Sequence, residues 1–306
     1  MPACPICEAP LPAPTITSPD RGNATPGRFE VAICAECAAG VTLPLASTGE
    51  LAAFYPQSYG PHSDIDRPLI AAISRAIRAW QGRRARGRVP LSRLAELAPE
   101  RGLDVGAGRG DIAAMLARRG WQMTAIEPSP AAVGHLRERG IDAREGVLAT
   151  TQLQPQGYGF VLFHHSLEHT IDPAADLRQA RDALRPGGLV LISVPNFGSW
   201  QRRLFRGAWY HLDVPRHRVH FAPQTLLRAL REAGFEDVEI ARSSSAVGLP
   251  ASVQYLAAGR CLFPDGLGLR VASGLCALTL PLSAALDRML GREGDTLHAG
   301  ARRPPA

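Results

Sequence analysis

The stretch LDVGAGRGD, residues 103–111, decides the fold. Apolar residues lead into a cluster of three glycines, and a helical pattern follows at about 110–119. Glycine adopts positive φ and lets a ligand approach the backbone, and a helix that starts at such a turn presents unpaired N–H groups. The stretch therefore predicts a strand, a ligand-binding turn and a helix in direct succession.

Outward from this turn, strand and helix patterns alternate along the chain. Such alternation is typical of a parallel sheet with helices on both faces. We predict an α/β fold with a doubly wound, mostly parallel, seven-stranded sheet. Its strands are expected at 101–105, 122–127, 142–145, 159–164, 188–194, 236–242 and near 296–303, and its helices near 110–119, 130–139, 174–184 and 223–233.

Composition excludes several classes of protein. The chain has 306 residues, 45% hydrophobic and 20% charged, as in ordinary globular proteins of about two domains. A run of 18 apolar residues and a leader-like N-terminus are both missing, so we expect a cytoplasmic protein. The net charge is +6, but all 34 basic residues are arginine, which is typical of a GC-rich genome; we expect no nucleic-acid partner.

Four cysteines near the N-terminus form two short-spaced pairs, CPIC and CAEC. Each CxxC turn directs two sulfurs toward one point, and a cytosolic chain rarely uses disulfides. The pattern predicts a structural zinc site with four thiolate ligands. The ligands would be Cys4, Cys7, Cys34 and Cys37.

The same reading divides the chain into three parts. We expect a zinc-binding module at 1–45, a helical linker or lid at 46–98, and the α/β domain at 99–306. Residues 245–290 interrupt the strand–helix rhythm as an apolar helical insertion. Within it, residues 271–286 carry no charge. This uncharged stretch is too short to cross a bilayer, so we expect at most peripheral membrane contact.

Two kinds of nucleotide ligand compete for the glycine turn. A dinucleotide turn has the spacing G-x-G-x-x-G, whereas here the third glycine comes one residue early. Asp104, which precedes the turn, would repel a pyrophosphate but suits a cationic ligand. Glu127 ends the next strand, where a carboxylate accepts hydrogen bonds from ribose hydroxyls in either ligand.

Four motifs in order, LDVGAGRG, Glu127, HHSLEHTIDP and LRPGGLVLISVPN, resemble the class I S-adenosylmethionine-dependent methyltransferases over about 100–242. The cysteine pairs ahead of them resemble a subgroup with an N-terminal zinc module. The resemblance implies that S-adenosylmethionine is the cofactor. It also implies cofactor contacts from Asp104, Gly106, Ala107, Gly108, Glu127, Val147 and His164. This chain departs from the family pattern at Gly159 and in the turn at 145–147, where aspartate is usual.

Histidines and carboxylates gather in two segments after predicted strands, HHSLEH at 164–169 and WYHLDVPRHRVHF at 209–221. One interpretation makes a histidine the general base for methyl transfer. Another places Glu168 and His169 with His217 or His220 around a divalent metal, and a third gives these side chains structural roles. The candidate catalytic residues are His165, Glu168, His169 and His217.

These observations predict a methyltransferase that acts at oxygen or carbon of a small-molecule, sugar or lipid-linked acceptor. A non-catalytic scaffold that binds the cofactor and a nicotinamide-dependent oxidoreductase are the alternatives. The sequence fixes neither the acceptor nor the oligomeric state.

Overall fold

The computed structural model describes residues 2–22, 25–45, 50, 54, 90–245, 247–261, 279, 281–290 and 294–305. Most of the linker expected at 46–98 lies outside these residues, apart from a short 3-10 helix, η1 (Pro90–Glu96). Residues 262–278 of the expected insertion also lie outside them.

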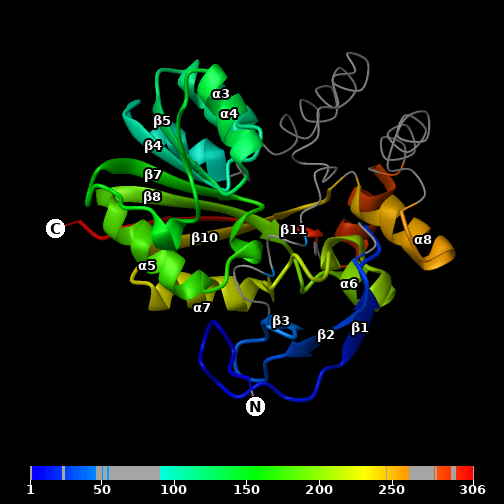
Figure 1. Ribbon diagram of the computed structural model, residues 1–306. Helices are drawn as coiled ribbons and strands as arrows, with labels where there is room; N and C mark the ends of the chain where they lie inside the picture. Colours follow the sequence, from blue (N-terminus) through cyan, green and yellow to red (C-terminus); the bar gives the residue numbers. More distant parts are fainter. Residues whose placement is uncertain are drawn as a thin grey trace.

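A seven-stranded sheet forms the centre of the molecule (Figure 1). Its strand order is β10-β11-β8-β7-β4-β5-β6, and β11 runs antiparallel to both neighbours. The order turns around at β4, which pairs in parallel with β5 on one side and β7 on the other. Ligands of open α/β sheets bind beyond the carboxyl ends of the strands at such a turning point. The strands are β4 (Arg101–Val105), β5 (Gln122–Glu127), β6 (Asp142–Glu145), β7 (Tyr158–His164), β8 (Leu184–Pro195), β10 (Glu236–Ser243) and β11 (Thr296–Arg302).

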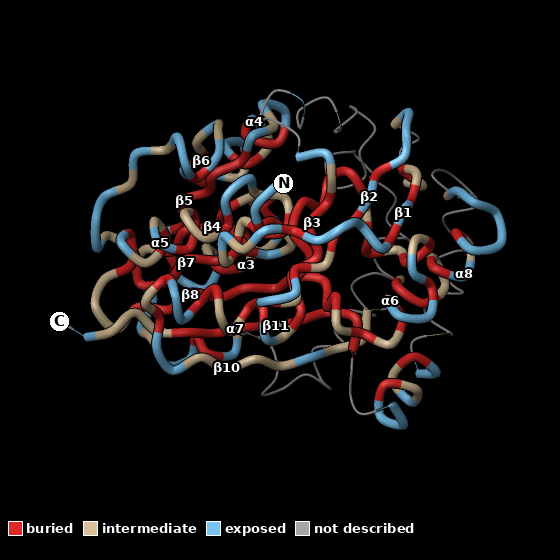
Figure 2. The backbone as a smooth tube through the Cα atoms, turned by 90° about the horizontal axis from the view of Figure 1, so that it is seen from below, coloured by how far each residue is buried: buried red, intermediate tan, exposed pale blue. Residues whose placement is uncertain are grey.

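Helices cover both faces of this sheet. On one face, α3 (Asp111–Ala117), α4 (Pro130–Glu138) and η1 bury an apolar cluster against β5, β7 and β8. On the other, α5 (Pro173–Ala183) packs against β7 and β8, and α7 (Pro223–Glu232) packs against β10 and β11. Figure 2 shows the buried strands between more exposed helices. The fold is thus the doubly wound α/β architecture that the sequence predicts.

Local sequence signals start two of these helices. Ser129 and Asp172 each precede a proline, and their side chains accept hydrogen bonds from the amides of Ala132 and Ala175. These N-caps satisfy amides that a helix leaves unpaired, and proline suits the first helical position because it has no N–H to lose.

A second, four-stranded sheet holds the N-terminal part of the chain, in the order β1-β2-β3-β9. Strands β1 (Ile16–Pro19), β2 (Arg28–Ile33) and β3 (Gly40–Leu43) belong to the expected zinc module. The fourth, β9 (Val219–His220), comes from the α/β part of the chain and pairs antiparallel with β3. No sequence pattern predicts this pairing, which joins the module to the segment 209–221.

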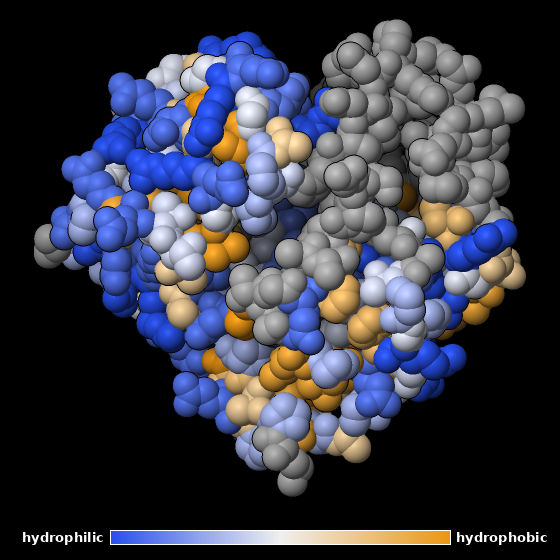
Figure 3. Space-filling view, viewed as in Figure 1, coloured by the Kyte–Doolittle hydropathy of each residue, from blue (hydrophilic) through white to orange (hydrophobic). Residues whose placement is uncertain are grey.

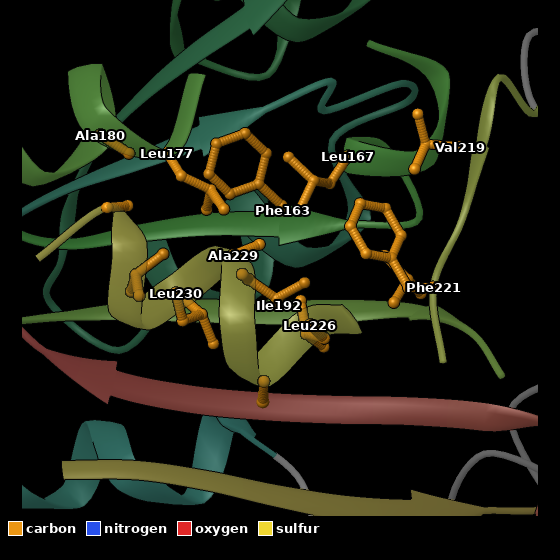
Figure 4. Packing of buried hydrophobic residues seen from close by; sticks show 14 of the residues in the cluster. Phe163, Leu167, Leu177, Ala180, Ile192, Val219, Phe221, Leu226, Ala229 and Leu230 are labelled. Atoms are coloured by element: carbon orange, nitrogen blue, oxygen red, sulfur yellow. The ribbon is translucent and has the colours of Figure 1, made fainter. Parts of the chain in front are cut away.

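The two parts also share a hydrophobic core. Figure 4 shows Val219 of β9 and Phe221, which follows β9, in the cluster that contains Phe163 of β7, Ile192 of β8 and Leu226 of α7. The same cluster includes Cys4, Cys34 and Cys37 among its buried residues. The N-terminal sheet therefore packs directly on the α/β core.

Helices fill the remaining connections: α6 (Trp200–Phe205) follows β8, α8 (Gly248–Ala258) follows β10, and 281–289 is helical. Four 3-10 turns complete the described elements: η2 (Leu148–Thr150), η3 (Leu167–His169), η4 (Arg206–Ala208) and η5 (Tyr210–Leu212). Among the described residues, no helix has the length and apolar character needed to cross a bilayer. Figure 3 shows hydrophilic side chains over most of the face around α3 and α4, and apolar ones nearer β2 and β3.

Candidate functional site

The glycine turn lies at the carboxyl end of β4, where the strand order reverses. Gly106, Gly108 and Gly110 have φ of 71°, 52° and 72°, values that glycine adopts without strain. The amide of Gly106 donates to the carbonyl of Ile126 at 2.8 Å, which fixes the turn beside the end of β5. A Cβ on Gly108 would meet nothing within 4 Å, so the middle of the turn borders open space that a ligand can fill.

Two buried carboxylates flank this turn. The Glu127 side chain accepts hydrogen bonds from the amides of Gly108 at 2.8 Å and Ser129 at 2.9 Å, so the turn itself orients it. Asp104 is 2% exposed, and burial together with the negative charge of Glu127 raises the pKa of its carboxyl to about 7. A cation bound at this place would relieve the repulsion between the two acids.

Two further predicted cofactor residues stand at neighbouring strand ends. Val147 follows β6, and the adjacent Gly146 amide donates to the Glu127 carbonyl at 3.1 Å, which brings this turn next to Glu127. His164 ends β7, and its ring makes an edge-to-face contact with the ring of His165, with 4.9 Å between centroids. Both positions border the same edge of the sheet as the glycine turn.

The turn that follows β7 packs against the glycine turn. The Ser166 hydroxyl donates to the carbonyl of Val105 at 2.6 Å, and a Cβ on Gly106 would lie 2.5 Å from the Ser166 Cβ. His165 has a φ of 54°, unusual for a residue with a side chain, and its amide donates to the Ser193 carbonyl at 2.8 Å. These contacts place HHSLEH directly beside the predicted cofactor turn.

Glu168, His169 and His217 form a cluster at this point. Each offers one ligand atom, and the three atoms lie within 4.8 Å of one another. Glu168 is 1% exposed, and within the described part of the chain neither of its carboxylate oxygens has a hydrogen-bond partner. Its Oε1 lies 3.4 Å from His165 Nδ1 and 3.9 Å from His217 Nε2. Burying an ionised carboxylate without a hydrogen bond is costly, so a bound cation or a proton would stabilise Glu168 here.

The two histidines of the cluster are oriented by backbone carbonyls. His217 Nδ1 lies 2.8 Å from the His211 carbonyl oxygen, and His169 Nδ1 lies 3.2 Å from that of Arg216. Because a carbonyl only accepts, the ring nitrogen facing it carries the hydrogen, which leaves Nε2 of each ring as a lone-pair donor. Burial and neighbouring histidines hold the pKa of His217 well below its ordinary value, so its ring stays neutral.

The other titratable residues of 209–221 also have partners outside the cluster of Glu168, His169 and His217. His211 Nε2 contacts Asp295 at 3.3 Å and Ser245 at 3.1 Å, Asp213 pairs with Arg216, and His220 Nε2 lies 3.0 Å from the Thr42 hydroxyl. Asp213 also lies close to the cluster, with its Oδ2 3.9 Å from His217 Nε2. Of the three histidines in this segment, the structure therefore brings only His217 to the cluster.

The four N-terminal cysteines converge on one point. Their sulfurs lie within 4.8 Å of one another, with distances of 3.6 Å for Cys4–Cys37 and for Cys7–Cys34. A tetrahedron with metal–sulfur bonds of about 2.3 Å has edges of about 3.8 Å, so the donor set fits zinc. The two turns are alike, since Cys4 and Cys34 each accept from the amide four residues on, and those residues, Glu8 and Ala38, share φ near 60°.

Comparison with known proteins shows the family to which the chain belongs. A family model described as a methyltransferase domain matches residues 77–240, more than half of the chain. The chain belongs to the class I S-adenosylmethionine-dependent methyltransferases. This result confirms the resemblance seen in the sequence and makes the protein an enzyme; the oxidoreductase and scaffold alternatives were wrong.

Relatives of this methyltransferase include ubiquinone biosynthesis O-methyltransferases. That of Aromatoleum aromaticum is 32% identical over 164 residues, which cover 49% of this chain and 70% of the relative. That of Nitrosospira multiformis is 34% identical and covers 49% and 68%. Among solved structures, a Haemonchus contortus phosphoethanolamine N-methyltransferase 2 is 18% identical, with a TM-score of 0.50, over 70% of this chain and 51% of that one. This likeness shows the fold alone.

The sequence interpretation missed the residues that connect the methyltransferase domain to the N-terminal sheet. Arg216 is fully buried and pairs with both Asp20 and Asp213, each through a bidentate contact. Thr42 of β3 donates its hydroxyl hydrogen to the His217 carbonyl at 2.6 Å. No local motif marks Thr42 or Asp20, because the partner of each lies 175 or more positions away in the sequence.

Proposed function

We propose that this methyltransferase transfers a methyl group to oxygen of a catechol-like or diol acceptor, small or lipid-linked. We further propose that Glu168, His169 and His217 hold a divalent cation that binds the acceptor. The observation that carries the proposal is the Glu168 carboxylate, buried beside two histidine nitrogens without a hydrogen-bond partner among the described residues. The two relatives named above are O-methyltransferases of ubiquinone biosynthesis, which supports oxygen as the methylated atom.

The cofactor is assigned to the glycine turn. In this proposal Asp104, Gly106, Ala107 and Gly108 surround the amino-acid part, and Glu127 accepts from the ribose hydroxyls. Val147 borders the adenine and His164 lies toward the methyl group. The paired buried acids support this pose, since a cofactor that carries positive charge on its sulfonium and amino groups compensates them. A pyrophosphate, by contrast, would add negative charge beside Asp104 and Glu127.

The cluster lies where an acceptor can face that methyl group. Gly106 and Ser166 are in contact, so the cofactor turn packs directly against the turn before Glu168. In the reaction an acceptor oxygen attacks the methyl carbon, the carbon–sulfur bond breaks, and its electron pair stays on sulfur. The protein contributes mainly by holding oxygen, carbon and sulfur in line.

Cation binding fits the cluster better than general-base catalysis does. The depressed pKa of His217 makes it a weak base but leaves it a neutral ligand at every pH near 7. One carboxylate oxygen and two imidazole nitrogens suit first-row divalent metals. Such a cation, when bound, favours the ionised form of an acceptor hydroxyl. His165, 3.4 Å from Glu168, is placed to serve as a further ligand or to take the proton.

Binding measurements on the zinc-loaded chain test the proposal. Calorimetry should show S-adenosylmethionine binding, and electron paramagnetic resonance should show Mn²⁺ binding at one site. Glu168→Gln should abolish Mn²⁺ binding and leave cofactor affinity within about twofold, because no contact among the described residues joins Glu168 to the glycine turn. Equal Mn²⁺ affinity in wild type and Glu168→Gln would refute the cation site. Activity toward a catechol probe that persists without any divalent metal beyond the zinc of the cysteine site would refute its role.

We also propose that the four cysteines hold a structural zinc ion, because all four ligand positions are filled by sulfur and no position remains for an acceptor. Metal analysis of wild type against Cys34→Ser should show the loss of one zinc ion per chain.

A further inference from the structure

The N-terminal sheet reaches the proposed cation cluster through one side chain. Thr42 of β3 is 3% exposed, and its hydroxyl lies 2.6 Å from the His217 carbonyl and 3.0 Å from His220 Nε2. Its amide donates to the carbonyl of Arg218 at 2.9 Å. Because the hydroxyl has one hydrogen and the carbonyl only accepts, Thr42 donates to His217 and accepts from His220.

The backbone that Thr42 contacts, residues 216–218, also contacts the other two members of the cluster, Glu168 and His169. His217 presents its ring to Glu168, and the Arg218 amide donates to the Glu168 carbonyl at 2.8 Å. His169 also contacts this segment, with its Nδ1 3.2 Å from the Arg216 carbonyl. A shift of residues 216–218 would therefore displace all three proposed ligands together.

We propose that Thr42 is a positioning residue for the cluster, so that the cysteine module forms part of the active-site scaffold and does more than stabilise the N-terminus. The inference rests on the proposed cation site. Partners that orient metal ligands typically change metal affinity about 10–100-fold when removed. Thr42 acts in this way through the backbone of His217, because it touches neither a ligand ring nor the cofactor turn in the described contacts.

The test compares three variants of the zinc-loaded full chain. Thr42→Val keeps the shape but removes the hydroxyl, and we expect its Mn²⁺ dissociation constant to rise about tenfold or more, as followed by electron paramagnetic resonance. Thr42→Ser restores the hydroxyl and should return the affinity to within about threefold of wild type. Cofactor affinity, measured by calorimetry, should not change in either variant.

Thr225→Val is the matched control. The Thr225 hydroxyl is as deeply buried and donates to the Cys37 carbonyl at the same distance of 2.6 Å, so it ties the same module to α7 without touching 216–218. We expect Mn²⁺ affinity to stay unchanged in this variant. Equal weakening in Thr42→Val and Thr225→Val would overturn the inference, as would unchanged affinity in Thr42→Val or no recovery in Thr42→Ser.

Two further outcomes stay informative. If Thr42→Val does not fold, Thr42→Cys, with similar volume and only a weak donor, takes its place and is held to the same criteria. If the wild type binds no Mn²⁺, the cation site has failed but Thr42 can still be tested from the ring ¹⁵N resonances of His217 by NMR. Shifted resonances in Thr42→Val but not in Thr42→Ser or Thr225→Val would support the positioning role, and identical resonances in all variants would overturn it.

Discussion

The pH dependence of cofactor binding follows from the state of Asp104. Burial and Glu127 raise the pKa of this carboxyl to about 7. In the proposed pose the ionised carboxylate faces the cationic end of the cofactor, so binding stabilises the ionised form. At a pKa of about 7, roughly nine-tenths of Asp104 is ionised at pH 8 and roughly one-tenth at pH 6. Affinity should therefore fall about tenfold between pH 8 and pH 6, a loss of about 1.4 kcal/mol.

Calorimetry at pH 6, 7 and 8 in buffers with different ionisation enthalpies measures this effect. The same data count the protons released on binding, which should approach one at pH 6 and vanish by pH 8. Asp104→Asn is the control, because its side chain cannot ionise. Titration of the cofactor's own amino group affects both proteins alike, so it cancels when the variant is compared with wild type. It should bind more weakly at pH 8 and lose the pH dependence that belongs to Asp104.

The reasoning is refuted if wild type and Asp104→Asn show the same change in affinity from pH 8 to pH 6. Tighter binding at low pH in the wild type would be equally decisive, because it would mean that the protonated carboxyl, and not the carboxylate, faces the ligand.

The remaining predictions concern stability and the metal module. Gly106→Ala should destabilise the chain by about 1–3 kcal/mol in urea unfolding, because of its φ of 71° and the Ser166 Cβ at 2.5 Å; Gly134→Ala, in α4 with nothing within 4 Å, should be neutral or slightly stabilising, and the opposite ranking would contradict the turn geometry. Arg216→Met should lose about 3–5 kcal/mol, since it leaves Asp20 buried without its bidentate partner. Arg185→Met, which breaks a partly exposed pair with Glu100, should lose under about 1 kcal/mol, and similar losses for both would argue against the buried pair. Removal of zinc with a chelator should lower the thermal midpoint of the wild type. The midpoint of Cys7→Ser should not change, because this variant should already lack the ion. Equal shifts in both proteins would count against the four-thiolate site.

Much of this protein is determined locally. The seven sheet strands, the four helices between them and the glycine turn follow from hydrophobic periodicity, N-caps such as Asp172 and glycines that need positive φ, all of which act over a few residues. The two cysteine turns are local in the same sense. For this reason the fold, the family and the position of Asp104 and Glu127 beside the glycine turn could be predicted from the sequence alone.

Only the tertiary structure decided which members of the two histidine-rich segments meet. The sequence offered His217 and His220 equally, and the β3–β9 register sends His220 toward Thr42 and leaves His217 facing Glu168. The same pairing brings the N-terminal module into contact with the segment that carries His217, and Arg216 pairs with Asp20, which is distant in the sequence. Contacts of this kind depend on how distant segments pack. Side-chain periodicity reports which face of an element is buried but carries no information about the partner that buries it.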